Sequence, residues 1–387
     1  MAEQKKMAEQ KKIGIAVLAC GGRSRYVVKN LFRDSNRQIE ILSVYDPIDS
    51  IIDKAFEEWQ IDGKNTKRCS SAYEAINTPG VEWVMVFSPN AFHKEQILMA
   101  FEAGKHVFSE KPLATKIEDC QAIFEAHQKT NLLFATGFVL RYAPIYRKIK
   151  ELLECEKFGK LLSIEANENI PPYHGGYIMA NWRRKTEISG PHILEKCCHD
   201  LDLINWFCQS LPSKISAFGS RKVFIPENRF LENKYDKETF SLWGGHNQID
   251  TAFGEDGDMI DTQMGIALFR NGIQVSFCAT MCNAIPERRM RFNCMEGTMT
   301  ADLYKLQLET KKIGDESTQV YNFKGDGHGG GDDHIMKELF DSMVNHTLPK
   351  CSGQEGLESA VFALALDQAM REEKIVDLEN IWAKLNR

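Results

Sequence analysis

Four ionisable side chains recur at intervals of three and four residues in the segment 189–202. They are His192, Glu195, His199 and Asp202. On an α-helix, residues at these intervals share one side, so the four side chains would form a row. An imidazole titrates near neutral pH and can therefore carry a proton. The row predicts acid–base chemistry, provided that other segments bring a substrate to it.

The segment itself predicts one continuous helix from Ser189 to Phe207. Ser189 or Gly190 can cap its start, and Pro191 suits the first helical position, where a missing N–H costs nothing. An apolar face at helical spacing supports the prediction and consists of Leu194, Cys197, Cys198, Leu201 and Ile204. In an ordinary amphipathic helix the charged row would face solvent. The sequence of this helix alone does not exclude that alternative.

Residues 13–137 alternate short apolar strands with helices, which predicts a doubly wound parallel sheet of the Rossmann type. The expected strands are Ile13–Ala19, Ile41–Asp46, Trp83–Ser88, His106–Ser109 and Leu132–Thr136, and the expected helices include Phe92–Ala103 and Ile117–Thr130. In such folds, ligands bind at the carboxyl ends of the strands.

The turn Ala19–Ser24 stands where a dinucleotide-binding fingerprint belongs. Gly21 keeps the central glycine, which lets the backbone approach a pyrophosphate at the start of a helix. Asp46 follows Ser24 by 22 residues (46 − 24) and suits the acid that binds the adenosine ribose. Because a carboxylate repels a 2′-phosphate, NAD is predicted over NADP, although Arg23 could neutralise such a phosphate. A purely structural glycine turn is the alternative.

Lys111 lies between Glu110 and Pro112, directly after the strand His106–Ser109. It is therefore predicted at the ligand-binding edge of the sheet. A lysine beside a bound nicotinamide can orient a substrate hydroxyl, whereas a lysine taken alone is most often an ordinary surface residue.

Residues 138–387 predict a second α/β unit built on a large, mainly antiparallel open sheet with one face covered by helices. Its expected strands are Lys160–Glu168, Ile215–Phe224, Asp261–Phe269, Ile273–Met281, Met290–Cys294 and Thr298–Leu306, and its expected helices are Pro144–Glu156, Asp333–Val344 and Gly356–Met370. The triplet Arg270-Asn271-Gly272 predicts a hairpin. Pro226–Asp258 is polar and predicts a long excursion or lid. A glycine-rich loop, Asp326–Asp332, carries His328.

Composition excludes several function classes. The chain of 387 residues has a net charge of −6, so it lacks the basic footprint of a nucleic-acid-binding protein. No segment is long and apolar enough to predict a membrane span, and no export signal is evident. The 11 scattered cysteines therefore predict reduced thiols in a cytoplasmic protein. The repeated, polar residues 1–12 predict a disordered leader.

The chain resembles the Gfo/Idh/MocA oxidoreductases, the glucose–fructose oxidoreductase and inositol dehydrogenase superfamily, over nearly its whole length. The resemblance rests on Ala19–Ser24, Ser88-Pro89-Asn90 with His93, Ala103–Val107 leading into Glu110-Lys111-Pro112, Arg141-Tyr142 with Pro144, Gly159-Lys160-Leu161, Trp182-Arg183 and the segment 189–202. It implies a Rossmann domain (13–137) and a C-terminal domain (138–387) whose open sheet builds a homodimer or homotetramer.

The same resemblance implies hydride transfer between NAD(P) and a secondary hydroxyl or ketone of a sugar, cyclitol or glycoside. The family's catalytic lysine falls on Lys111, and its Asp-x-x-x-His pair falls on Glu195 and His199, with glutamate replacing aspartate. The expected cofactor-binding residues are Gly21, Gly22, Arg23, Ser24, Asp46, Ser88, Asn90, His93, Glu110, Lys111 and Arg141. No metal is expected.

In the predicted reaction, His199 takes the hydroxyl proton, Lys111 polarises the same oxygen, and Glu195 binds a neighbouring hydroxyl or tunes His199. Other polar or aromatic groups, several of them expected in loops, are predicted to contact the substrate. They are Tyr173, His174, Trp182, Arg183, His192, Asp202 and His328.

Three other functions remain open at this stage. Some relatives in the superfamily act as redox-neutral glycosidases that oxidise a sugar transiently and then return the hydride. A metal site is conceivable because His192, Glu195 and His199 share one helical side, but the spacing is not His-Glu-x-x-His and the nearby cysteines point elsewhere. A protein that binds NAD without catalysis is the third, and the joint presence of Lys111 and His199 argues against it.

Overall fold

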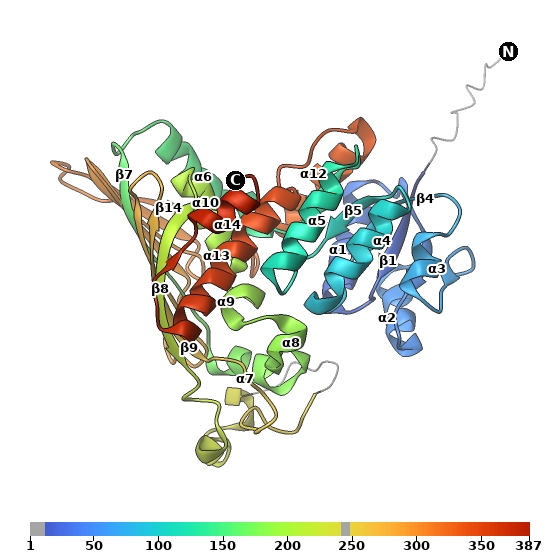
Figure 1. The fold of residues 1–387 in the computed structure, drawn as a ribbon, viewed down its shortest axis with the longest axis horizontal. Coiled ribbons are helices and arrows are strands. Elements are labelled where there is room, and N and C mark those ends of the chain that lie inside the picture. Colours follow the sequence, from blue (N-terminus) through green and yellow to red (C-terminus); the bar gives the residue numbers. More distant parts are fainter. Residues whose placement is uncertain (1–11, 241–247) are drawn as a thin grey trace.

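The structure, a computed structural model, describes residues 12–240 and 248–387. The leader expected at 1–12 lies outside these residues except for Lys12. Two sheets organise the described chain, and a buried apolar core runs continuously between them (Figure 1).

The first sheet is a six-stranded parallel sheet in the order β3-β2-β1-β4-β5-β6. Its strands are β1 (Ile13–Leu18), β2 (Ile39–Tyr45), β3 (Lys67–Arg68), β4 (Val81–Val86), β5 (His106–Ser109) and β6 (Phe134–Thr136). The helices that join them are α1 (Gly22–Asp34), α2 (Asp49–Trp59), α3 (Ala72–Ile76), α4 (His93–Glu102) and α5 (Ile117–Gln128). This order confirms the predicted doubly wound fold, because the chain reverses direction across the sheet between β1 and β4.

The second sheet has nine strands in the order β14-β13-β12-β11-β7-β10-β9-β8-β15. They are β7 (Leu161–Asn169), β8 (Pro212–Ser220), β9 (Thr262–Phe269), β10 (Gln274–Thr280), β11 (Arg289–Cys294), β12 (Gly297–Asp302), β13 (Gln307–Lys312), β14 (Gln319–Asn322) and β15 (Val376–Asp377). Only β7 and β10 pair in parallel, so the sheet is mainly antiparallel, as predicted. The predicted hairpin joins β9 to β10, with Gly272 at a φ of +88° in its turn.

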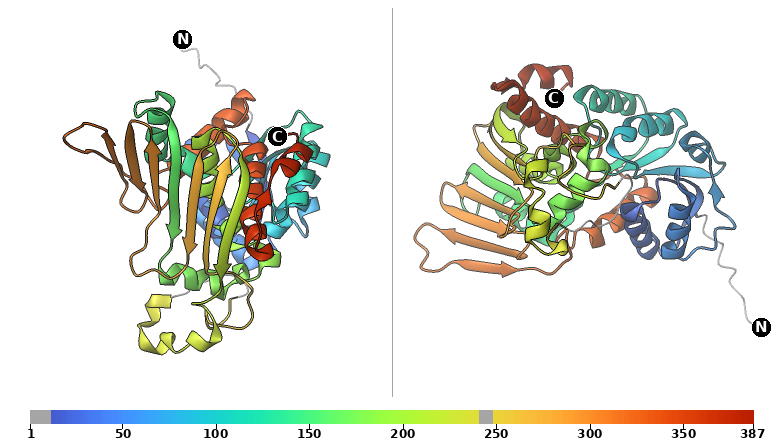
Figure 2. Two further views of the ribbon diagram at one scale, coloured as in Figure 1. Left: turned by 60° about the vertical axis from the view of Figure 1, so that its left-hand side comes forward. Right: turned by 90° about the horizontal axis from the view of Figure 1, so that it is seen from below.

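Helices cover one face of the large sheet and leave the other bare (Figure 2). The chain between β6 and β8 supplies α6 (Pro144–Glu154), α7 (Pro172–Ala180), α8 (Thr186–Ser189), α9 (His192–Glu195) and α10 (Cys198–Cys208). The last part of the chain supplies α12 (Asp332–Asn345), α13 (Gly353–Glu372) and α14 (Glu379–Lys384). Alternation of buried and exposed residues along β9 and β10 matches a sheet with one covered face.

Helix α13 joins the two sheets. It packs against α5 of the parallel sheet, against β8 of the large sheet, and against α10. A capping box starts the helix, since Ser352 and Glu355 exchange side-chain-to-backbone hydrogen bonds. Gly353 lies so close to the Phe134 ring that a Cβ atom would come within 2.4 Å of it. This contact lets α13 approach β6 directly.

The segment expected as a lid, Pro226–Asp258, is more ordered than its sequence suggests. Outside the undescribed residues 241–247 it contains α11 (Leu231–Lys234) and two short 3₁₀-helices, Pro226–Asn228 and Lys237–Phe240. Its apolar residues form a small second core with α7, which includes Phe224, Phe240 and Phe253. Scattered aromatic residues, rather than a regular period, hold this segment together.

Among the described residues, no helix has the length and hydropathy needed to cross a membrane.

Candidate active site

The dinucleotide turn lies between β1 and α1. Gly21 is the N-cap of α1, and no side chain caps the helix there. A Cβ atom on Gly21 would meet no atom within 4 Å, so open space adjoins the start of the helix. The first backbone N–H groups of a 13-residue helix therefore remain available to a ligand phosphate.

Asp46 follows β2 and is buried at the carboxyl edge of the parallel sheet. Its Oδ2 accepts the N–H of Cys20 at 2.9 Å, and its Oδ1 accepts the N–H of Ile48 at 3.0 Å. These bonds fix the carboxylate next to the turn that precedes α1. An uncapped helix start, a glycine facing open space and an adjacent acid together fit a dinucleotide.

Three further residues predicted to bind the cofactor hold loops at the same edge. Ser88 Oγ donates to Gln96 Oε1 at 2.8 Å, and Asn90 Nδ2 donates to the carbonyl oxygen of Ser189 at 2.7 Å. The two ring nitrogens of His93 lie 2.8 Å from the carbonyl oxygens of Ser88 and Pro112. Burial lowers the pKa of His93. These contacts join the loop after β4 to the Lys111 loop and to α8.

Gly22, Arg23 and Ser24 form the first turn of α1. Ser24 Oγ donates to the carbonyl oxygen of Gly21 at 2.8 Å, which stabilises the turn. Arg23 does not face the Asp46 carboxylate but bridges two others: its Nε lies 2.7 Å from Glu110 Oε1, and its Nη1 lies 2.8 Å from Asp332 Oδ1. The positive charge of Arg23 is therefore already paired with Glu110 and Asp332.

The predicted continuous helix 189–207 is wrong. The chain forms three short pieces instead: α8 ends at Ser189, α9 covers His192–Glu195, and α10 starts at Cys198. Gly190 has a φ of +73°, and the residue before a proline is disfavoured in a helix. Pro191 is the N-cap rather than the first helical residue. Ser189 caps nothing here, because its hydroxyl donates to carbonyl oxygens, including that of Arg183 at 2.9 Å.

A side chain from the other sheet occupies the break between α9 and α10. Lys111 Nζ donates to the backbone carbonyl oxygen of Glu195 at 2.7 Å. Glu195 ends α9, where carbonyl groups lack partners within the helix. The lysine thus caps α9, and two of the three predicted catalytic residues, Lys111 and Glu195, are in contact at the break.

The Glu195 carboxylate faces Arg183. Arg183 Nε donates to Glu195 Oε1 at 2.8 Å, and its Nη1 donates to the Tyr177 hydroxyl at 2.8 Å. The guanidinium also stacks on the Trp182 ring, 4.2 Å from its centroid. Burial raises the pKa of Glu195, but Arg183 and Lys111 outweigh that effect and hold the pKa well below its usual range. Glu195 is therefore a carboxylate at neutral pH.

His199 lies in the first turn of α10 and is 3% exposed. Its ring meets the Phe138 ring edge to face, and its Nδ1 is buried without a hydrogen-bond partner in the described chain. Burial, reinforced by the positive charge of Lys111, lowers the pKa of His199 well below its ordinary value. The imidazole is therefore neutral at pH 7 and able to accept a proton.

Two more of the predicted histidines lie near Glu195, and a lysine that the sequence did not single out accompanies them. Burial lowers the pKa of His174 to about 3 and that of His192 to about 4. Both ring nitrogens of His192 are buried without a hydrogen-bond partner in the described chain. Lys196 lies 3.5 Å from the buried Glu168 carboxylate and, together with Glu195, acts on the charge of both histidines.

The expectation that Tyr173, His174, Trp182 and Arg183 lie in loops is wrong. Tyr173 and His174 belong to α7, which starts at Pro172 because proline is well suited to the first helical position. Trp182 and Arg183 belong to a 3₁₀-helix. Tyr173 is 39% exposed, which sets it apart from the buried group.

Asp202 and Arg141, predicted for substrate and cofactor, bind one another. Arg141 Nε and Nη2 each donate to one oxygen of Asp202 at 2.7 Å; Asp202 is buried, and the Arg141 side chain is 12% exposed. A bidentate pair satisfies the carboxylate and the guanidinium together. The structure therefore does not bring Asp202 into the group around Glu195 and His199.

His328 does reach this group, although 129 residues separate it from His199 (328 − 199). The two rings lie 5.9 Å apart, centroid to centroid. His328 Nδ1 lies 2.6 Å from Asp332 Oδ2, and Asp332 Oδ1 accepts from Arg23. Asp332 is not among the residues predicted from the sequence, although its spacing of four residues from a histidine in a glycine-rich loop is a visible signal.

A second missed group underlies α10. Arg288 donates to both oxygens of Asp200, at 2.9 and 2.6 Å, and its Nη1 lies 3.3 Å from Glu168. All three are at most 2% exposed. Burial raises the pKa of Asp200, while Arg288 opposes that shift. This ion cluster attaches α10, and with it His199, to the large sheet.

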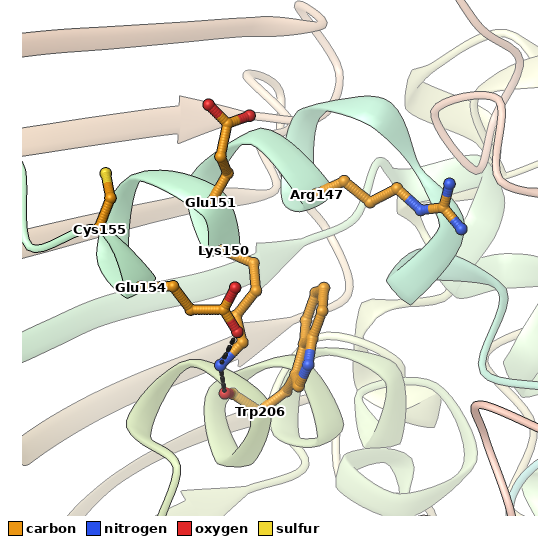
Figure 3. Close-up of a pocket in the computed structure, with 6 residues that line it drawn as sticks. All are labelled: Arg147, Lys150, Glu151, Glu154, Cys155 and Trp206. Carbon is orange, nitrogen blue, oxygen red and sulfur yellow. Dashed lines mark hydrogen bonds and ion pairs between the residues drawn. The ribbon is translucent and has the colours of Figure 1, made fainter.

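The hollow in Figure 3 lies elsewhere, on the surface formed by α6 and α10, and contains none of the predicted residues. Its lining residues are Arg147, Lys150, Glu151, Glu154, Cys155 and Trp206. Lys150 is already bound to the Trp206 carbonyl oxygen at 2.9 Å and to Glu154 at 3.4 Å. Within the described ranges, no group of three or more histidine, cysteine or acidic side chains is placed to hold a metal ion.

Comparison with known proteins agrees with this architecture. Residues 13–138 match the model of an oxidoreductase family with an NAD-binding Rossmann fold, GFO_IDH_MocA, and residues 150–378 match the C-terminal alpha/beta domain of the same family. The chain is 23% identical to a myo-inositol 2-dehydrogenase of Thermotoga maritima, over 81% of this chain and 85% of that protein.

Two further similarities concern a part of the chain and the fold. A scyllo-inositol 2-dehydrogenase (NAD(+)) of Bacillus subtilis is 27% identical over 57% of this chain and 60% of its own length. A solved levoglucosan dehydrogenase, in complex with NADH and levoglucosan, superposes with a TM-score of 0.79 at 17% identity, over 95% of this chain and 100% of that one. Together with the two domain matches, these findings confirm the resemblance, and the chain belongs to the Gfo/Idh/MocA family of NAD-dependent oxidoreductases.

Proposed function

We propose that the protein transfers a hydride between NAD and a secondary hydroxyl or ketone of a sugar or cyclitol. The observation that carries the proposal is the contact between the Lys111 and Glu195 segments beside His199, next to a turn that fits a dinucleotide. The names of the relatives support the substrate class, since they act on inositols and levoglucosan.

Bound NAD would supply the hydride acceptor, and the protein would supply position and proton transfer. His199 would take the hydroxyl proton, because its neutral imidazole is a competent base. Lys111 would donate to the same oxygen and stabilise negative charge that develops there. The hydrogen bond that Lys111 Nζ already donates to the Glu195 carbonyl oxygen would hold the ammonium group in place beside the substrate.

Glu195 and Arg183 would form the polar wall that recognises further hydroxyl groups. Both are charged. Glu195 accepts from Arg183, and Arg183 donates to Glu195 and to the Tyr177 hydroxyl, so a carboxylate with two oxygens and a guanidinium with five N–H groups each retain capacity for a sugar hydroxyl. Trp182, stacked on Arg183, offers an aromatic face of the kind that packs against a sugar ring. His174 and His192 would complete this wall as neutral donors or acceptors.

The test is a panel of monosaccharides, cyclitols and glycosides, incubated with NAD or NADP and followed at the nicotinamide absorbance. Reduction of NAD by one or a few polyols is the expected result. Release of an aglycone from an aryl glycoside without net NADH would instead establish the glycosidase function. Tight NAD binding with no turnover of any compound in either direction would contradict both activities.

We also propose that the bare face of the large sheet forms a homodimer or homotetramer. Several large apolar residues are exposed on this sheet, namely Leu162, Phe218, Met264, Ile266 and Leu268. Phe218 and Met264 lie opposite each other on neighbouring strands, and exposed apolar residues grouped in this way are typical of a protein contact.

A further inference from the structure

His328 lies on a loop with a well-defined backbone. Asp326 Oδ1 accepts the N–H groups of His328 at 3.0 Å and of Gly330 at 3.2 Å. Gly329 has a φ of +64°, and a Cβ atom on Gly331 would come within 2.3 Å of the Val139 carbonyl oxygen. The glycines thus permit a tight turn that packs closely on the neighbouring segment, and this turn places His328 beside His199.

The hydrogen bond to Asp332 determines the protonation of the His328 ring. An ionised carboxylate can only accept, so Nδ1 must carry the hydrogen that bridges 2.6 Å to Asp332 Oδ2. In the neutral ring, Nε2 then holds a lone pair, and it has no hydrogen-bond partner within the described chain. The ring lies 5.9 Å from the His199 ring, and the His328 side chain is 29% exposed.

Asp332 is itself firmly held. It is 2% exposed and accepts from Arg23 Nη1 at 2.8 Å, while Arg23 Nε binds Glu110 at 2.7 Å. Glu110 Oε2 in turn accepts the backbone N–H of Lys111 at 3.2 Å. A chain of charged hydrogen bonds therefore links His328, through α1, to the loop that carries Lys111.

His199 is poorly suited to retain a proton. It is buried, and its Nδ1 has no hydrogen-bond partner among the described residues. Positively charged or basic groups also act on it, namely Lys111, Arg288, His328 and Lys196. A proton that it takes from a substrate must leave before the next turnover. His328 adjoins it and is more exposed. Burial lowers the pKa of His328, and the Asp332 carboxylate, which stabilises an imidazolium, opposes that shift.

We propose that Asp332 is a positioning residue for proton release, holding His328 so that its Nε2 receives the proton which His199 has taken from the substrate hydroxyl. The inference rests on the proposed dehydrogenase function. In the step, the N–H bond of the His199 imidazolium breaks, an N–H bond forms on His328, and solvent then takes the proton. The N–H bonding pair stays on His199 as a lone pair, the lone pair of His328 Nε2 forms the new bond, and no group changes its oxidation state. The groups that face His328 are Asp332 from α12, Arg23 from α1, Lys196 from the break before α10, and His199.

The first test compares Asp332→Asn with Asp333→Asn. Asp333 is the next residue on α12, and its side chain is 61% exposed and pairs with Arg33 at 3.4 Å, so it is a matched control. We expect kcat of Asp332→Asn to fall about 100-fold, at the lower end of the usual contribution of acid–base catalysis. Asp333→Asn should keep the wild-type kcat, and Asp332→Glu, which retains a carboxylate, should recover part of the loss.

The second test uses His328→Ala and added imidazole. A lost proton carrier can be replaced by a small base from solution, so kcat of His328→Ala should rise with imidazole concentration at constant pH, whereas that of the wild type should not. A purely structural role predicts no such rescue. Equal kcat in the wild type and in Asp332→Asn, or failure of imidazole to restore any activity, would overturn the inference.

A third measurement does not depend on turnover. In wild-type protein labelled with ¹⁵N-histidine, the signals assigned through His328→Ala should show hydrogen on Nδ1 and none on Nε2 at neutral pH. The opposite tautomer would refute the inference whatever the activity is. A wild-type protein with the expected tautomer but without dehydrogenase activity would refute the proposed function and, with it, the assigned role in proton release.

Discussion

Lys111 Nζ and the backbone carbonyl oxygen of Glu195 lie 2.7 Å apart, although 84 residues separate them. The bond joins the parallel sheet to the large sheet at the point where α9 ends. It gives the lysine a fixed position and gives the last carbonyl of α9 a partner. The same lysine that caps α9 at the break before α10 is therefore the one proposed to bind the reacting oxygen.

Replacing Lys111 with Ala should lower kcat/KM by roughly two to four orders of magnitude, because a donor to the reacting oxygen is lost. Steady-state kinetics with the substrate found in the polyol panel would measure this loss. Lys116→Ala is the control, since Lys116 is an exposed lysine five residues away on the same loop. Wild-type kinetics in Lys111→Ala would remove the lysine from the mechanism.

The pH dependence of polyol oxidation should reflect His199. Burial and neighbouring positive charge hold the pKa of His199 below its ordinary value of 6.5, so the ring stays neutral, and competent as a base, down to lower pH. The decrease of kcat/KM at acidic pH should therefore have its midpoint below pH 6.5. His199→Gln should remove this pH dependence together with most of the activity. A limb at or above pH 7 in the wild type would contradict this assignment.

Replacing Asp46 with Ala should weaken NAD binding about 10- to 100-fold, the equivalent of one charged hydrogen bond. NADP binding should be unchanged or tighter, because the repulsion of a 2′-phosphate disappears. Quenching of protein fluorescence by each dinucleotide would measure both affinities. Asp62→Ala is a suitable control, because the Asp62 side chain is 65% exposed and binds its neighbour Lys64. An unchanged NAD affinity in Asp46→Ala would contradict the prediction that Asp46 binds the adenosine ribose.

Removing the buried Arg288 should destabilise the fold. Arg288→Met leaves Asp200 and Glu168 without their shared partner, and breaking a buried ion pair in this way costs about 3–5 kcal/mol. Urea unfolding would measure the change. Arg291→Met tests the same substitution at a surface pair, 3.8 Å from Glu165 and 41% exposed, where we expect about 0–1 kcal/mol. Equal losses at both positions would refute the predicted role of burial.

A charge on the bare face of the large sheet should change the oligomeric state. Ile266, which is 62% exposed on β9, lies within the proposed subunit contact, so Ile266→Lys should yield smaller particles in light scattering. Ile285→Lys serves as the control, because Ile285 is 87% exposed outside the strands. Identical particle masses for the wild type and Ile266→Lys would contradict this contact.

The sequence by itself determined the parallel sheet, the dinucleotide turn and the hairpin between β9 and β10. Each depends on neighbours in the chain: an apolar run predicts a buried strand, and the glycine of the dinucleotide turn and the Asn-Gly of the hairpin predict turns. Gly21, Asp46 and Lys111 could be located in this way because strand ends in a parallel sheet meet at one edge.

Only the tertiary structure decided how the site is assembled. The sequence from 189 to 207 carries the period of one helix, yet a lysine from a distant loop takes the carbonyl of Glu195 and the helix is interrupted. Asp202 has the right spacing for the row of ionisable groups, yet it binds Arg141. Arg23 and Asp332 form a hydrogen bond although 309 residues separate them in the sequence. Such pairings depend on where folded elements come together, and this information is absent from local periodicity and propensity.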